Sequence, residues 1–334
     1  MDYPKFKVFV RCFTYNQSQY ITETLDSFCM QETSFPYICC IVDDNSTDGE
    51  QDVIFKYIKE NFENEKVPFR PSETEHAKIV YARHKINRNC YFVVFFLKEN
   101  LYSKKQSDIK FEYIYEWRKI CRYEAFCEGD DWWLSSNKLQ RQYDVMELHP
   151  EIDMCACGAE CYLNGRACDA IAPTDIERIL STDEVIRGGG GFLSTNSLFY
   201  RMDYVHDNYL FWKVKSLDYL IQIRGSLRGG VYYLPERMSA YRMSSLGSWN
   251  IQNKKSIDSR FDTNMEIFSA LDVLNFETKG KYEEAIKDYK SDNSNVLFQQ
   301  AYSGTKYNDI IKKISLKGRI KIVYFFVKKL VVCR

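Results

Sequence analysis

Carboxylate side chains gather at two places in the sequence, each directly after an apolar run. Asp43-Asp44 follow residues 38–42, and Glu128-Gly129-Asp130-Asp131 follow residues 122–127. Adjacent carboxylates repel one another unless a cation neutralises them, and their oxygens are the ligands that hard divalent cations prefer. The pattern therefore predicts a site for Mn²⁺ or Mg²⁺, where the metal would bridge two phosphates of a nucleotide and offset charge on a departing diphosphate.

The two clusters differ in how easily a purely structural role explains them. Residues 43–46 fit a turn and helix cap, which also accounts for Asn45 to Asp48. The same explanation fits Glu128–Asp131 poorly, because two tryptophans follow and because Gly129 would let the backbone approach a ligand closely. Each cluster alone is weak evidence for a ligand site, whereas the two together, in this order, favour one shared site.

The strands and helices expected around these clusters place both at one edge of a sheet. Residues 6–10 form a short apolar run, and residues 38–42 have the continuous apolar character of a central strand buried on both faces. Each run precedes an apolar helical stripe, at 21–28 and at 53–62. The order strand–helix–strand–helix predicts a parallel sheet of the nucleotide-binding type. Ligands bind such sheets beyond the carboxyl ends of the strands, where both clusters would lie.

The remainder of the chain carries weaker signals. The run 91–97 fits a strand or a buried helical turn, and periodicity does not decide between them. Gly188–Gly191 is expected to be a flexible loop, and it is not a P-loop because no Gly-Lys-Ser/Thr follows. The other expected elements are, in chain order, a loop at 98–110, a helix at 111–120, a strand at 122–127, a helix capped by Ser135 or Ser136, strands at 154–163 and 195–201, a helix from Leu217, a strand at 231–234, a strand ending at 241–242, and helices from about residue 252.

Composition excludes some classes of protein. The 334 residues carry 46 basic and 46 acidic side chains, and this zero net charge argues against a nucleic-acid partner held by global electrostatics. The N-terminus lacks the charged and apolar regions of a signal peptide, so we expect the 12 cysteines to be reduced, mostly buried thiols of a cytoplasmic protein. The cysteines at 155–168 fit no zinc spacing well, and the chain has only four histidines.

The C-terminal tail, residues 309–334, interleaves basic and apolar side chains. Its longest uncharged apolar run, 322–327, is far shorter than the roughly 20 residues that span a bilayer. A basic amphipathic helix of this kind fits peripheral contact with an anionic membrane surface. It fits equally well a helix packed on its own domain, and the sequence leaves both open.

With these motifs the sequence resembles the family 2 glycosyltransferases of the GT-A fold, in particular bacterial enzymes that build capsular and lipopolysaccharide chains. The resemblance covers about residues 5–250 and is most specific in the first half. The matching segments are Thr14-Tyr15-Asn16, residues 42–49, Cys127 to Trp133 with Lys138 to Gln142 behind them, the glycine loop 188–191, Leu217-Asp218, and Tyr241-Arg242 with Trp249.

The resemblance implies a fold and an activity. The fold would be a Rossmann-like, nucleotide-diphospho-sugar transferase α/β domain at 1–250, with a mixed sheet flanked by helices, and a helical extension at 251–334. The activity would be metal-dependent, inverting transfer of a sugar from a nucleotide-sugar donor, UDP-linked, to a hydroxyl of a glycan or lipid-linked acceptor. The setting would be surface polysaccharide synthesis in the cytoplasm or on the inner face of the plasma membrane.

The resemblance also implies roles for individual residues. Tyr15 would line the nucleobase pocket and Asp44 would hydrogen-bond the base. Asp130 would contact the ribose or sugar, and Asp131 would ligate the metal. The further nucleotide-sugar-binding residues would be Thr14, Asn16, Asp43 and Trp132, and the further metal ligands Glu128 and Asp130.

Asp218 would be the general base that deprotonates the acceptor hydroxyl. A carboxylate at a helix start facing the cleft is able to take that proton. The plainer explanation is an acid at a helix N-terminus, stabilised there by the helix dipole.

Some positions depart from the family pattern. Ser244 stands where many relatives have a histidine, and Asn89-Cys90 replaces a typical Asn-Gly. Arg83, Arg88 and Lys98 are all candidates to contact the diphosphate. A non-catalytic, nucleotide-sugar-binding partner subunit is the alternative function. A nucleotidyltransferase is less favoured, because no glycine-rich basic loop follows the first strand, and the sequence does not identify the sugar or the acceptor.

Overall fold

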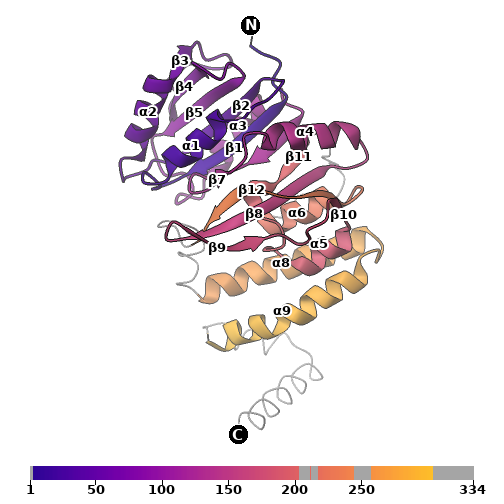
Figure 1. Ribbon diagram of the computed structural model, residues 1–334. Helices are drawn as coiled ribbons and strands as arrows, with labels where there is room; N and C mark the ends of the chain where they lie inside the picture. The colour runs from indigo at the N-terminus through magenta and orange to yellow at the C-terminus, as the bar shows by residue number, and fades with distance from the viewer. Residues whose placement is uncertain (1–2, 203–210, 212–216, 244–256, 304–334) are drawn as a thin grey trace. The chain divides into compact units, whose positions relative to one another are not determined.

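The computed structural model describes residues 3–202, 211, 217–243 and 257–303, with the backbone alone at 257–260 and 295–303. The chain divides into two compact units, Met1–Ser248 and Trp249–Arg334 (Figure 1). The predictions for Ser244, Trp249 and the tail 309–334 lie outside the described residues.

The first unit is built on one mixed sheet, as predicted. Its central strands β6 (Tyr123–Phe126), β1 (Val8–Thr14), β2 (Tyr37–Asp43) and β5 (Cys90–Leu97) are adjacent and parallel. The undecided run at 91–97 is thus a strand, and every residue of β5 is buried. This parallel centre is the part of the sheet that carries both acidic clusters at its carboxyl edge.

Further strands, most of them paired antiparallel, extend the sheet on both sides. Next to β5 lie β4 (Ala77–His84) and then β3 (Phe62–Glu65), both antiparallel to their neighbours. Beyond β6 the described order continues with β11 (Phe199–Arg201), β8 (Met154–Leu163), β12 (Val231–Arg242) and β10 (Arg178–Leu180), while β9 (Arg166–Ile171) pairs with β8 and β7 (Trp132–Trp133) with β12.

Helices cover both faces of the parallel centre (Figure 1). Because successive strand side chains point to opposite faces, Val8 and Val10 of β1 join a core with α1 (Ile21–Cys29), α2 (Glu50–Asn61) and α4 (Lys138–Leu148). Phe9 joins a second core with α3 (Ser107–Arg118). The described cysteines are free thiols, most of them buried in these strands.

Several local predictions were wrong. The helix α4 starts after Asn137 with no side-chain cap, so neither Ser135 nor Ser136 caps it. The strand expected at 195–201 is a 3₁₀ turn, η1 (Thr195–Ser197), followed by the short β11. The two strands expected at 231–242 are one strand, interrupted by a bulge where Pro235 lies.

Two further helices of the first unit, among its described residues, contact each other. The helix α5 (Thr182–Gly188) begins with a capping box formed by Ser181 and Glu184. The helix α6 (Asp218–Ser226) accepts a hydrogen bond from α5, between Thr182 Oγ1 and the Ser226 carbonyl at 2.7 Å. The loop predicted at 98–110 is shorter than expected, because α3 already starts at Ser107.

The described part of the second unit contains two helices, α8 (Ile257–Glu277) and α9 (Glu283–Ser303), joined by a turn in which Lys279 and Gly280 have positive φ. Lys290 of α9 bonds Asp272 of α8 at 2.6 Å, and Phe268 contacts Tyr289 edge to face. None of the described helices has both the length and the apolar character needed to cross a bilayer.

Candidate functional site

The two acidic clusters lie at the same edge of the sheet, on either side of the carboxyl end of β1. Thr14 pairs with Asp43 on one side, and the Asp44 amide donates to the Thr14 carbonyl at 3.1 Å. On the other side the Gly129 amide donates to the Phe13 carbonyl at 3.1 Å. The shared edge that the sequence pattern predicted is therefore present.

The loops after β1 and β2 are joined through Glu50, the first residue of α2. Its carboxylate is completely buried and accepts hydrogen bonds from the Thr14 hydroxyl, from the Gln17 amide at 2.9 Å and from the Ser46 hydroxyl at 2.8 Å. Burial raises the pKa of Glu50 to about 7. Sequence reasoning missed this residue, because an acid in the first turn of a helix is ordinarily explained by the helix dipole.

Asn16 adds a second connection between the same two loops. The backbone amide of Asn16 donates to Ser46 Oγ at 2.9 Å, and its side-chain oxygen accepts a hydrogen bond from the backbone amide of Thr47 at 2.7 Å. Asn16 has φ 55° and Asn45 has φ 62°, a conformation that asparagine tolerates better than most residues. The side chains of Thr14 and Asn16, predicted to bind the donor, thus connect the loops that follow β1 and β2.

Tyr15 lies between these two residues and is the exception. Among the described residues we find no hydrogen bond or aromatic contact to its ring, which is partly exposed. The role of Tyr15 in lining a nucleobase pocket stays a prediction.

Asp43 and Asp44 are both bonded within the protein. Asp43 accepts the Ser46 amide at 3.0 Å, which fits the turn interpretation, and Gln51 Nε2 at 2.5 Å. It does not cap α2, whose N-cap is Gly49 without a side-chain bond. Asp44 accepts the backbone amides of Leu101 and Tyr102 at 2.8 and 3.1 Å. Lys110 Nζ lies 3.6 Å from the Asp44 carboxylate. Asp44 thereby holds the loop 98–106 against the carboxyl end of β2.

The glycine of the acidic motif after β6 packs closely against two side chains of the loop after β1. A Cβ added to Gly129 would lie 2.2 Å from Thr14 Oγ1 and 2.5 Å from Gln17 Oε1. The expectation that this glycine lets a ligand approach was therefore wrong, since the space is filled by Thr14 and Gln17.

The neighbouring Glu128 is partly exposed and lies among charged groups. Burial raises its pKa to about 7, with Asp218 and Asp130 adding repulsion and with Arg11 and Lys110 acting in the opposite direction. Carboxylates that raise one another's pKa in this way form a place where a cation would be stabilised.

Asp131 behaves differently from Glu128. It is 5% exposed, and its two oxygens accept the Arg242 amide at 2.8 Å and Asn196 Nδ2 at 3.0 Å. Each oxygen of this carboxylate thus accepts one hydrogen bond from the protein, and its role as a metal ligand stays a prediction. Within the described residues, no three His, Cys, Asp or Glu side chains are grouped so that they could hold a metal ion.

Arg242, at the end of β12, holds the acidic motif in place through hydrogen bonds and ring contacts. Its guanidinium donates to the Asp130 carbonyl at 2.9 Å and to Glu23 of α1 at 2.5 Å. It lies 4.4 Å from the ring centroid of Tyr20 and 4.5 Å from that of Trp132. Trp132 also packs on Tyr162 at 4.7 Å, so this ring, predicted to contact the donor, packs against protein side chains.

Asp218 reaches the same edge from a distant part of the chain. It is the first residue of α6, it is exposed, and its Oδ2 accepts the Thr195 hydroxyl at 2.9 Å. The next residue, Asn196, bonds Asp131. The turn η1 thus links Asp218 to the acidic motif through two consecutive residues, Thr195 and Asn196.

The three cations proposed for a diphosphate occupy different places. Arg83 pairs with Tyr91 near the amino end of β5 and bonds the Arg88 carbonyl at 2.9 Å. Both arginines therefore lie at the edge opposite the carboxylates. Lys98 follows the carboxyl end of β5, where it forms an ion pair with Glu73 at 2.7 Å.

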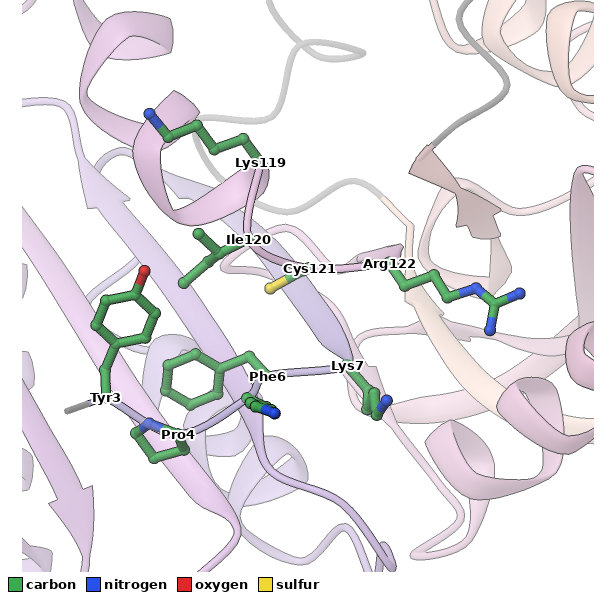
Figure 2. A pocket seen from close by; sticks show the side chains of 9 residues that line it. Tyr3, Pro4, Phe6, Lys7, Lys119, Ile120, Cys121 and Arg122 are labelled. Carbon is green, nitrogen blue, oxygen red and sulfur yellow. The ribbon is translucent and has the colours of Figure 1, made fainter. Parts of the chain in front are cut away.

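A pocket of about 540 Å³ lies at the opposite edge too, at the start of β1 and just before β6. Figure 2 shows an apolar centre of Phe6, Ile120 and Cys121, with Lys119 and Arg122 extending away from it in different directions. Ligands of such sheets bind beyond the carboxyl ends of the strands, so this pocket is separate from the candidate site.

Comparison with known proteins shows which family and which fold this chain is similar to. Residues 12–91 match the family model "Glycosyl transferase family 2". Uncharacterized protein Rv1520 of Mycobacterium tuberculosis is 29% identical over 240 residues, which cover 71% of this chain and 59% of that protein. Uncharacterized protein Mb1547 of Mycobacterium bovis matches with the same values. The chain therefore spans about 59% of the length of these curated relatives.

Solved structures show the same fold. S. aureus TarS 1-349 superposes with a TM-score of 0.54 at 17% identity, over 94% of this chain and 77% of that one. The same protein in complex with UDP-GlcNAc gives 0.54 at 15% identity, over 94% and 78%. The fold is thus the α/β fold of the GT-A glycosyltransferases. The family match covers the segment with Tyr15, Asp43 and Asp44, and together these findings support a glycosyltransferase.

Proposed function

We propose that this chain transfers a sugar from a UDP-linked donor to a hydroxyl of a glycan or lipid-linked acceptor, with inversion at the anomeric carbon. The observation that carries the proposal is the meeting of Asp218 with the motif Glu128–Asp131 at the carboxyl edge of β1, β2 and β6. The solved complex of TarS 1-349 with UDP-GlcNAc, which has this fold, supports a UDP-linked donor.

The donor nucleotide would lie over the loops after β1 and β2. Tyr15 would stack on the base, because its ring has no partner among the described residues that would compete. Thr14, Asn16 and Asp43 would shape this pocket by holding the two loops together. Asp44 would act on the base either directly or through the loop 98–106 that it anchors.

Glu128 and Asp130 fit a divalent cation better than Asp131 does. Mg²⁺ commonly binds through one or two carboxylates together with substrate phosphates, and these two side chains supply that number. A bound Mn²⁺ or Mg²⁺ would offset the negative charge of the departing diphosphate. Asp131 would position the motif, since its carboxylate is bonded to Asn196 and Arg242.

Asp218 would act as the general base. The acceptor oxygen attacks the anomeric carbon while its proton passes to the Asp218 carboxylate. The bond between that carbon and the diphosphate oxygen breaks, and the electron pair leaves with the nucleoside diphosphate. Attack from the side opposite the leaving group inverts the configuration.

The wider setting is proposed from the sequence resemblance. It would be the synthesis of capsule or lipopolysaccharide at the inner face of the plasma membrane, with the tail 309–334 making peripheral contact with that membrane.

The test is to incubate the protein with Mn²⁺ and a panel of nucleotide sugars and to measure release of free nucleoside diphosphate. We expect turnover of a UDP-sugar that Asp218→Asn slows about 100-fold. Nucleotide binding should change little, because the proposal gives Asp218 no contact with the nucleotide. We expect Asp130→Asn to raise the Mn²⁺ concentration for half-maximal rate about tenfold.

Asp144→Asn, on the exposed side of α4, is the matched control and should behave like the wild type. Equal rates in Asp218→Asn and the control would contradict the assigned base. Tight nucleotide-sugar binding without turnover, even with acceptor extracts added, would instead establish the non-catalytic partner subunit.

A further inference from the structure

We propose that Ser194–Ser197, the segment containing the turn η1, is a positioning element for the reaction, and that Thr195 is the residue in it that orients the Asp218 carboxylate. The inference rests on the proposed function, because it takes Asp218 as the general base. It adds a residue for which neither the motifs nor the family match gives a role.

The turn is anchored firmly through Asn196, whose side chain is 1% exposed. Its side-chain nitrogen donates to Asp131 Oδ2 at 3.0 Å and to the Ala240 carbonyl at 2.7 Å. Its own carbonyl accepts Trp133 Nε1 and Ser239 Oγ, both at 3.0 Å. A buried polar side chain with this many partners has one available position, so the turn is fixed relative to the acidic motif.

The helix that carries Asp218 is tied to the same segment. Gln222 lies one turn further along α6, and its Nε2 donates to the carbonyls of Gly190 and Leu193 at 3.2 and 3.0 Å. Gln222 is fully buried. The base-carrying helix, the glycine loop and the turn therefore form one connected unit.

Thr195 connects this unit to the reacting group. Its hydroxyl donates to Asp218 Oδ2 at 2.9 Å. No hydrogen bond to Asp218 Oδ1 occurs in the part of the chain that the structure describes, so that oxygen is available to accept a proton. An exposed aspartate at a helix start would otherwise rotate freely, and holding one oxygen directs the other.

The test compares Thr195→Val, which keeps the shape and removes the hydroxyl, with Thr195→Ser, which keeps the hydroxyl. The reaction measured is donor turnover with Mn²⁺ and the UDP-sugar that the panel identifies. We expect Thr195→Val to lower kcat about tenfold with KM for the donor within about twofold. We expect Thr195→Ser to restore at least half of the wild-type kcat.

Thermal unfolding separates orientation from folding. Because the Thr195 hydroxyl is only partly buried, both variants should unfold within about 2 °C of the wild type. A Thr195→Val enzyme with wild-type kcat overturns the positioning role while Asp218→Asn still tests the proposed function. Equal losses in the Val and Ser variants, or a rise in donor KM alone, also overturn it. A wild type that turns over no donor overturns both.

Discussion

At the scale of single residues, the protonation of Glu50 makes the stability of the folded protein depend on pH. Its pKa is raised from 4.5 to about 7 by burial. The folded protein therefore keeps a proton that the unfolded chain releases above about pH 4.5. A raised carboxyl pKa gives a contribution to stability that is complete below pH 4.5 and is lost as the pH rises through 7.

Glu50→Gln, which resembles the protonated acid in shape, should remove this pH dependence. We expect the free energy of unfolding of the wild type to fall between pH 4.5 and 8, and that of the variant to fall less, by about 2 kcal/mol. Urea unfolding at a series of pH values measures this. Glu60→Gln, on the exposed side of the same helix, should retain the wild-type slope. Parallel curves for the wild type and Glu50→Gln would show that another group is responsible.

The site residues that sequence analysis found are those whose position follows from their near neighbours. Asp43 ends β2, Asp130 lies in the loop after β6, and Asp218 starts α6, so local patterns placed these residues at the ends of elements. Glu50 and Asn196 depend on partners 33 and 65 positions away, which no local pattern contains. The signal for Asn196 was an amide in the otherwise apolar and small-residue stretch 192–200.

At the scale of elements, one carboxylate holds a whole loop. Asp44 accepts two consecutive backbone amides, at Leu101 and Tyr102, and faces Lys110. Asparagine has one oxygen to offer and places an amide group against a donor, so Asp44→Asn should loosen the loop 98–106.

We expect hydrogen exchange at Leu101 and Tyr102 to become about tenfold faster in Asp44→Asn, and tryptic cleavage after Lys104 or Lys105 to speed up. Exchange measured by mass spectrometry reports the first effect and limited proteolysis the second. Asp108→Asn, an exposed acid in the first turn of α3, serves as the control and should leave both rates unchanged. Unchanged protection in Asp44→Asn would mean that other contacts hold the loop.

The elements themselves were predictable where hydrophobic periodicity is local. The strand β2 and the helices α1 and α2 follow their apolar patterns closely, whereas β1 begins two residues later and ends four residues later than the run 6–10. Periodicity did not decide β5, because all of its residues are buried and alternation is lost. The strand β12 was expected as two, since Pro235 interrupts the pattern and only pairing with β8 on both sides of the bulge makes it one.

At the scale of the whole molecule, positive and negative charges balance over the chain, but an excess of positive charge lies in the tail. Residues 309–334 contain eight basic side chains and one acidic one, although the net charge of the chain is zero. Basic segments near an anionic surface gain about 1 kcal/mol per residue. Peripheral binding through the tail would therefore be strong only on anionic lipids and at low salt.

Liposome flotation tests this, comparing the full chain with one that ends at Asn308. We expect the full chain to float with vesicles containing phosphatidylglycerol, to remain behind with phosphatidylcholine alone, and to be released by high salt. The shortened chain should not float with either. Equal flotation of both chains would place the membrane contact elsewhere or show that there is none.

The contacts of Arg242 have a consequence for how the protein is made. This residue, at the end of β12, bonds the motif around Asp130, which leaves the ribosome more than one hundred residues earlier. Asn196, which supports the same motif, is also synthesised late. A nascent chain that has emerged only through α4 contains Asp131 without Asn196 and Arg242, the two residues that donate to its carboxylate. These contacts of the motif therefore form only after β12 has been synthesised.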